Sequence, residues 1–137
     1  MNSAVDATAA NSDVPAVLQF LSGWIERTNG AIRPTGRIRI EYDSERLPYY
    51  RHWHTGVRFW WIRVSVRFHP RVNLRTQALA VITPETAETP NPLMSCELLV
   101  PPGTSQLEMW FENGDSMSPG TAWDSRYGSN YFFDVVQ

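Results

Sequence analysis

Apolar and polar residues alternate in four segments of the chain. In each segment every second residue is aliphatic or aromatic, and most of the residues between them are polar. A period of two places successive side chains on opposite faces of a β-strand, so that one face can be buried. We therefore predict strands over 38–42, 62–68, 107–111 and 131–135.

Weaker patterns predict four more strands, over 17–24, 49–54, 76–82 and 96–100. The last of these is closed by Pro101-Pro102-Gly103, a strong turn signal. The segment 14–27 also fits a helix with Asp13 as its N-cap and Pro15 in its first turn. We favour a strand there, because Ser22-Gly23 interrupts the segment and the rest of the chain is typical of β-structure.

Glycine, proline, asparagine or aspartate recurs about every eight to twelve residues, the strand spacing of a β-sandwich or barrel. Segments 83–92 and 113–120 are rich in such residues and are expected to be loops. No helix longer than a turn or two is expected. The predicted fold is all-β, an antiparallel two-sheet β-sandwich of immunoglobulin-like size with roughly seven to nine strands. It spans residues 15–137 as a single domain, after a mobile tail over residues 1–14.

Composition narrows the class of protein and of partner. A chain of 137 residues with 42% hydrophobic and 19% charged residues fits one globular domain and not a disordered chain. The net charge of -2 supplies no general attraction to nucleic acid, so no nucleic-acid partner is expected. All 12 basic residues are arginine. We interpret these arginines as residues on the solvated outer faces of strands. The alternative is that they form a basic binding face.

Several other site classes are not indicated by the sequence. Cys96 is the one cysteine, so no intramolecular disulfide can form, and it is most simply a small core residue.

The N-terminus lacks the pattern of a secretory signal, and the apolar stretches are too short to cross a membrane. We expect a cytoplasmic protein without a membrane partner, and a processed export signal stays open as an alternative. No cofactor or metal is predicted, because nucleotide-binding and zinc-protease motifs are absent.

The end of the chain, 123–135, combines aromatic, amide, carboxylate and glycine residues in one short run. Trp123 and Tyr131 offer flat faces for stacking, and Asp124 and Asn130 offer directional hydrogen bonds. Gly128 permits a tight turn among them. The run suits a polar ligand with apolar faces, such as a sugar.

Arg126 completes the set of ligand candidates in this run, since its guanidinium group would hydrogen-bond hydroxyl groups. A structural interpretation of the same residues stands beside the functional one. Trp123 would plug the end of the sandwich, Asp124 would cap backbone amides of the turn, and Asn130 would brace two strands.

Residues 96–135 resemble the C-terminal half of carbohydrate-binding module family 21, which binds starch and glycogen. That family places a strand and a proline-containing turn before an alternating strand, a loop and the motif Trp-Asp-Asn-Asn-x-Gly-x-Asn-Tyr. The corresponding segments here are 96–102, 107–111 and 123–131, with Ser125-Arg126 in place of the two asparagines. The ending is more similar still to that of small uncharacterised bacterial β-sandwich proteins. The resemblance implies a β-sandwich fold and, as a further expectation, sugar binding.

A second candidate site is the run Tyr49-Tyr50-Arg51-His52-Trp53-His54. In a strand, His52 and His54 would share a face with Tyr50, and two imidazoles at this spacing can bind zinc or copper. Candidates for a further ligand are His69, Glu108, Glu112 and Asp124. A structural or solvent-facing pair is the favoured interpretation, and a general base with a pKa near neutrality is another alternative.

Tryptophans form a third candidate set. The alternation along the predicted strands places two of them, Trp61 and Trp110, on outer strand faces beside charged residues. Such residues suit a sugar-stacking platform or a protein interface. The alternative is that each packs under a loop or pairs with an arginine by a cation–π contact.

These observations leave three functional hypotheses. The leading one is a non-catalytic binding protein for a glycan or another small polar ligand, bound through Trp123, Asp124, Arg126, Asn130 and Tyr131. The second is a small-molecule cyclase, isomerase or hydrolase in which His52 or His54 transfers a proton, aided by Tyr50 or Asp124. The third is an interaction module, such as a homodimer formed through Trp61 or Trp110.

Overall fold

The computed structural model describes residues 14–71, 73–82 and 92–137. Over these residues the chain is all-β, which confirms the predicted class, and its helical content is one short 3-10 helix, η1 (Ser44–Arg46). No helix in this part of the chain has the length and apolar composition that crossing a bilayer requires. The tail predicted over 1–14 and the loop predicted over 83–92 lie almost wholly outside the described residues.

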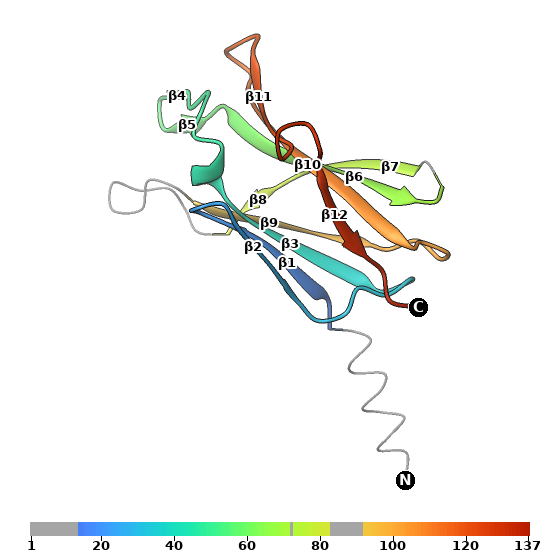
Figure 1. Ribbon diagram of the computed structural model, residues 1–137. Coiled ribbons are helices and arrows are strands. Elements are labelled where there is room, and N and C mark those ends of the chain that lie inside the picture. The colour runs from blue at the N-terminus through green and yellow to red at the C-terminus, as the bar shows by residue number, and fades with distance from the viewer. Residues whose placement is uncertain (1–13, 72, 83–91) are drawn as a thin grey trace.

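Ten strands form two five-stranded sheets that pack against each other as a sandwich (Figure 1). The first sheet has the order β2-β1-β3-β9-β8, and the second has the order β11-β10-β6-β7, with β12 also paired to β10. The strands of the first sheet are β1 (Ala16–Leu21), β2 (Ile25–Asn29), β3 (Arg37–Asp43), β8 (Ala80–Val81) and β9 (Leu93–Leu99). Those of the second are β6 (Trp60–His69), β7 (Asn73–Ala78), β10 (Gln106–Asp115), β11 (Thr121–Asp124) and β12 (Tyr131–Asp134).

The strand count is twelve in the described residues, above the seven to nine predicted, because a separate hairpin and several short strands add to it. The hairpin consists of β4 (Trp53–His54) and β5 (Val57–Arg58). The sheets are antiparallel except where β1 runs parallel to β3. This exception arises because the chain forms the β1–β2 hairpin and then crosses to the other side of β1.

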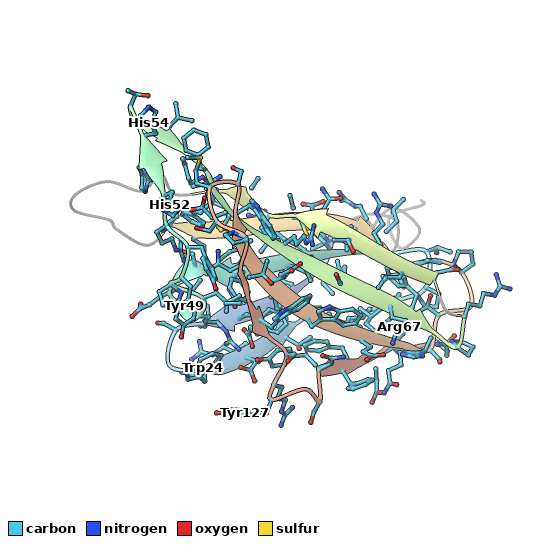
Figure 2. The ribbon with its side chains drawn as sticks, turned by 90° about the horizontal axis from the view of Figure 1, so that it is seen from above. Trp24, Tyr49, His52, His54, Arg67 and Tyr127 are labelled. Atoms are coloured by element: carbon cyan, nitrogen blue, oxygen red, sulfur yellow. The ribbon has the colours of Figure 1, made fainter. Side chains whose placement is uncertain are left out.

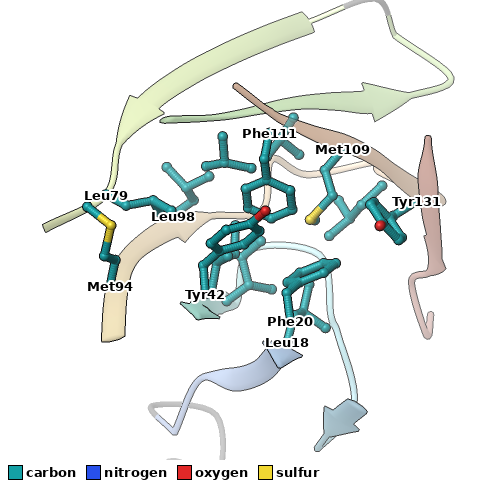
Figure 3. Close-up of a cluster of buried hydrophobic side chains, with 14 of the residues drawn as sticks. Leu18, Phe20, Tyr42, Leu79, Met94, Leu98, Met109, Phe111 and Tyr131 are labelled. Atoms are coloured by element: carbon teal, nitrogen blue, oxygen red, sulfur yellow. The ribbon is translucent and has the colours of Figure 1, made fainter. Parts of the chain in front are cut away.

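The core lies between the two sheets and is built from the residues that alternation identified. Ile38, Ile40 and Tyr42 of β3 are fully buried, as is the apolar face of β10. Four aromatic rings, from Phe20, Tyr42, Phe111 and Tyr131, meet at its centre (Figure 3). Phe111 lies 4.7 Å from Phe20 and 4.2 Å from Tyr42, measured between ring centroids. Burial of such rings stabilises the fold by about 1.5–3 kcal/mol per side chain.

The segment predicted as one strand over 76–82 is divided between the sheets. β7 ends at Ala78 in the second sheet, and β8 begins at Ala80 in the first. Leu79, between them, points into the core and donates its N–H to the carbonyl of Ile62. An apolar residue at this point therefore anchors the crossing of the chain from one sheet to the other.

Candidate functional site

The C-terminal motif forms an edge strand that is broken in the middle. β11 and β12 pair with the same side of β10, β11 with residues 111–114 and β12 with residues 106–109. The turn 125–130 leaves the sheet between them, level with Trp110 (Figure 1). Within it Ser125 accepts hydrogen bonds from the N–H groups of Gly128 and Asn130. Gly128 has a φ of 88°, which confirms its predicted use as a turn residue.

Asp124 lies under this turn and is only 3% exposed. Its Oδ2 accepts hydrogen bonds from the Tyr42 hydroxyl at 2.7 Å and from Arg46 Nε at 3.1 Å. Its Oδ1 accepts one from the Tyr131 hydroxyl at 2.6 Å. Asp124 therefore joins buried side chains and does not cap backbone amides of the turn, and both of its oxygens accept hydrogen bonds from these side chains.

Arg46 is the cation at the centre of this network, and sequence reasoning missed it. Its Nη1 donates to the carbonyls of Leu21 and Ile25, at 3.0 and 3.3 Å. Its Nη2 donates to Glu26 at 3.0 Å and to the Tyr131 hydroxyl at 2.8 Å. With the bond from Nε to Asp124, these contacts match the five N–H groups of a guanidinium. Arg46 therefore ties the β1–β2 hairpin to the edge of the second sheet.

The network shifts the proton affinities of its members. Burial, and then the charge and hydrogen bond of Asp124, raise the pKa of Tyr42 far above its ordinary value. Burial, and then the hydrogen bond that the Tyr131 hydroxyl donates to Asp124 and the charge of Asp124, raise the pKa of Tyr131 as well. Burial lowers the pKa of Arg46. The charge of Asp124, the Tyr131 hydroxyl and the hydrogen bonds to Glu26 and Asp124 together outweigh burial, so the pKa of Arg46 is raised. Both phenols stay neutral and Arg46 stays charged across the physiological pH range.

A cleft of about 410 Å³ opens above this network, between the edges of the two sheets. Its floor includes Asp124 and Tyr131, and its walls come from the β1–β2 hairpin and from the turn after β11. The wall residues are Trp24, Glu26, Trp123, Ser125, Arg126 and Tyr127. Trp24 is 63% exposed, Trp123 is 55% exposed, and Tyr127 is fully exposed. Figure 2 shows Trp24 and Tyr127 projecting from the same edge of the molecule.

Trp24 is a cleft residue that no motif in the sequence indicated as a ligand contact. It follows Gly23 in the β1–β2 turn and has a φ of 59°, which a bulky side chain adopts only at some cost. One side of its indole lies over the guanidinium of Arg46, 4.7 Å from the ring centroid. Arg126 and Tyr127, on the opposite wall, also have positive φ values. Strained backbone thus presents large side chains on both sides of the cleft.

Asn130 lies outside the cleft, against the outer face of the second sheet. Its side-chain amide donates to Glu108 Oε2 at 2.8 Å, which gives it the bracing role that the structural interpretation predicts. The other carboxylate oxygen, Glu108 Oε1, accepts hydrogen bonds from His69 Nε2 at 2.7 Å and from Arg67 Nη1 at 3.2 Å. Burial alone would raise the pKa of Glu108, but the hydrogen bonds of Asn130 and His69 and the charge of Arg67 lower it below its ordinary value.

Trp61 and Trp110 lie on the outer face of the second sheet, as parity predicts. Both are partly buried, and each carries an arginine on its ring, Arg63 on Trp61 at 4.7 Å and Arg67 on Trp110 at 5.4 Å. These cation–π contacts agree with the structural alternative for the pair. Neither tryptophan is among the residues that line the cleft.

The predicted histidine site lies away from the cleft, near the β4–β5 hairpin (Figure 2). His52 Nδ1 lies 2.7 Å from Oδ2 of the buried Asp115, which also accepts the backbone N–H groups of His52 and Met117. Burial would raise the pKa of Asp115, but these hydrogen bonds lower it. His54 is exposed on β4, and Tyr50 packs against Gly120. The strand predicted over 49–54 forms only at Trp53–His54, and Tyr50 has a φ of 53°, so the strand face expected to carry Tyr50, His52 and His54 is not formed.

No group of three or more histidine, cysteine, aspartate or glutamate side chains that could hold a metal ion occurs among residues 14–71, 73–82 and 92–137. His52 is paired with Asp115, His69 with Glu108, and Asp124 with Arg46. The structure therefore does not bring together the ligand set considered for His52 and His54.

Comparison with known proteins gives one match. No curated protein and no solved structure matches the chain. The resemblance to carbohydrate-binding module family 21 is not tested by these comparisons and stays a prediction. A family model described as a family of unknown function, DUF6209, matches residues 7–136. Because the match covers nearly the whole chain, the protein belongs to the DUF6209 family.

Proposed function

We propose that this protein is a non-catalytic binding protein whose ligand is a carbohydrate or a similar polyol, held in the cleft between the sheet edges. The observation that carries the proposal is the exposure of Trp24, Trp123 and Tyr127 around one cleft. Exposed aromatic side chains that share a concave site are uncommon without a ligand or partner. Their flat faces suit the apolar faces of a sugar ring.

The polar groups of the cleft support the same ligand class. Arg126 and Glu26 lie on opposite walls, where they can bond hydroxyl groups between the aromatic faces. Tyr131 and Asp124 are locked to Arg46, so the floor is rigid before binding. A preformed floor reduces the ordering cost of association. The cleft volume of about 410 Å³ lies in the range of small-molecule sites.

The proposal predicts that Trp123→Ala weakens glycan binding while Trp53→Ala does not. Trp53 is a matched control, because it is similarly exposed but lies on the separate β4–β5 hairpin. Loss of a stacking face is expected to reduce affinity at least roughly tenfold. The measurement is calorimetric titration with ligands selected on an array of neutral and acidic glycans.

Two results would contradict the proposal. The first is a folded wild-type protein that binds no glycan on the array. The second is equal affinity of wild type and Trp123→Ala for a glycan that does bind. Thermal unfolding of each variant checks that the fold is intact.

The enzymatic alternative keeps one supporting contact, the 2.7 Å approach of His52 Nδ1 to the buried Asp115. Such a carboxylate would orient the imidazole as a general base. Neither His52 nor His54 lines the cleft at Trp123 or the larger hollow formed by residues 14–17, 29–31 and 33–37, however. Asp115 also fixes the local loop through two backbone N–H groups, which accounts for the contact without catalysis.

A further inference from the structure

Trp123 belongs to two surfaces of the molecule. It lines the cleft, and its place in β11 opposite Glu112 also puts it on the outer face of the second sheet. Asp124, the next residue, points the other way, into the core. The cleft and the outer face therefore meet at the indole of Trp123.

Phe132 is the next exposed aromatic residue on that face. Phe132 is on β12, where it lies opposite Glu108 of β10, and it is 48% exposed. Directly opposed residues in an antiparallel pair share a face, so Phe132 and Trp123 point the same way. Their partners Glu108 and Glu112 are four residues apart on β10, which separates the two aromatic positions by about 13 Å along the strand. A single sugar ring is too short to touch both.

The strip between them offers hydrogen-bonding groups at fixed positions. The ring of Phe132 stacks on His69, with 6.4 Å between centroids and 26° between planes. His69 and Asn130 are both held by Glu108, and Trp110 lies between the two glutamates on β10. These side chains therefore hold one another in position through direct contacts.

The charges on the strip compensate one another. Glu108 pairs with Arg67 at 3.2 Å, and Glu112 pairs with Arg63 at 2.6 Å. The two carboxylates and two guanidinium groups sum to zero. At the cleft, the two carboxylates of Glu26 and Asp124 are matched in number by the guanidinium groups of Arg46 and Arg126, so these four charges also sum to zero. A surface of paired charges and aromatic faces favours an uncharged ligand over a polyanion.

We infer that the ligand is an uncharged oligosaccharide chain that begins in the cleft at Trp24, passes over Trp123 and ends on Phe132. This inference rests on the proposed function and extends it by naming the charge and minimum length of the ligand. One unit of the chain occupies the cleft, and the following units lie along the β10 side of the outer face. The Trp123 indole is the point that both parts of the chain touch.

The test is the dependence of affinity on chain length in wild type and in Phe132→Ala. The probes are maltose and cellobiose with their six-unit homologues, and heparin serves as the polyanion. In wild type the six-unit chain should bind roughly tenfold or more tightly than the disaccharide of the same linkage. Phe132→Ala should remove this advantage and leave disaccharide affinity unchanged, whereas Trp24→Ala should weaken both.

Leu74→Ala is the matched control, because Leu74 is exposed on the same face but lies on β7, the opposite edge strand of the sheet. It should change neither affinity. Equal affinity for short and long chains in wild type would overturn the length inference while leaving sugar binding in the cleft intact. Tighter binding of heparin than of the neutral chains would overturn the inference on charge. Failure of every sugar to bind wild type would overturn the proposed function as well.

Discussion

The side chains of Arg46 and Asp124 face each other with only 1% of each exposed, so each neutralises a charge that water does not reach. A buried pair of this kind contributes little net stability compared with apolar residues of the same size. Loss of one partner is different, because the other charge is then left buried and uncompensated. At the scale of single residues, the integrity of the cleft floor depends on this pair.

Arg46→Met is therefore expected to reduce the free energy of unfolding by about 3–5 kcal/mol. Arg37→Met is the comparison, because Arg37 forms an exposed ion pair with Glu97 and such pairs contribute about 0–1 kcal/mol. Urea unfolding followed by tryptophan fluorescence measures both. A loss as small for Arg46→Met as for Arg37→Met would contradict the role assigned to the network.

At the scale of elements, β6 and β10 form the central pair of the second sheet. Where they pair, a tryptophan ring of β6 packs against a glycine of β10. Trp61 lies opposite Gly114, and a Cβ at Gly114 would overlap the indole ring. A glycine inside a strand often marks such a close approach. The Trp61 indole can therefore pack against the backbone of Gly114, with the guanidinium of Arg63 over its ring.

We expect Gly114→Ala to destabilise the protein by about 1–3 kcal/mol through overpacking. In a Trp61→Leu background the same substitution should cost much less, since the obstructing ring is gone. A double-mutant cycle by chemical unfolding measures the coupling. Equal effects of Gly114→Ala in both backgrounds would show that the ring does not depend on the glycine.

The elements that sequence predicts well are those with one buried face. β3, β6 and β10 alternate because they line the core, and their positions follow from that pattern. β2 is different, because all five of its residues are exposed and no alternation marks it. β11 is short and carries Trp123 outward, so it looks like part of a loop in the sequence.

At the scale of the whole molecule, the cleft is assembled from segments that are far apart in the sequence. The C-terminal motif located Trp123 and Arg126, because an unusual local composition marks them. Trp24 and Arg46 carry no such mark, since their roles depend on contacts across the sandwich that only the fold creates. The same long-range contacts place Asp124 and Tyr131, predicted as ligand contacts, in the floor of the cleft, where they bond to each other.

The stability of the whole fold at acid pH depends in part on two carboxyl groups, those of Glu108 and Asp115. The folded-state pKa of Glu108 and that of Asp115 are both below their ordinary values. A lowered pKa contributes stability that is complete above the unfolded value, about 4.5 for Glu108, and is lost as the pH falls through the folded value. The stability difference between wild type and Glu108→Gln should therefore be largest near neutral pH and shrink below about pH 4.5.

Thermal unfolding across a pH series measures this difference. A gap between wild type and Glu108→Gln that stays constant from neutral to strongly acidic pH would contradict the assignment.

The break between β11 and β12 has a further consequence, for self-association. An unbroken strand on this side of β10 would present a long row of free backbone groups, which is a template for pairing with another chain. Here each half of the edge is only four residues long, and the turn 125–130 projects between them. The segment that supplies the aromatic cleft wall thus also protects the sheet from edge-to-edge aggregation, and shortening it to simplify the binding site would remove that protection.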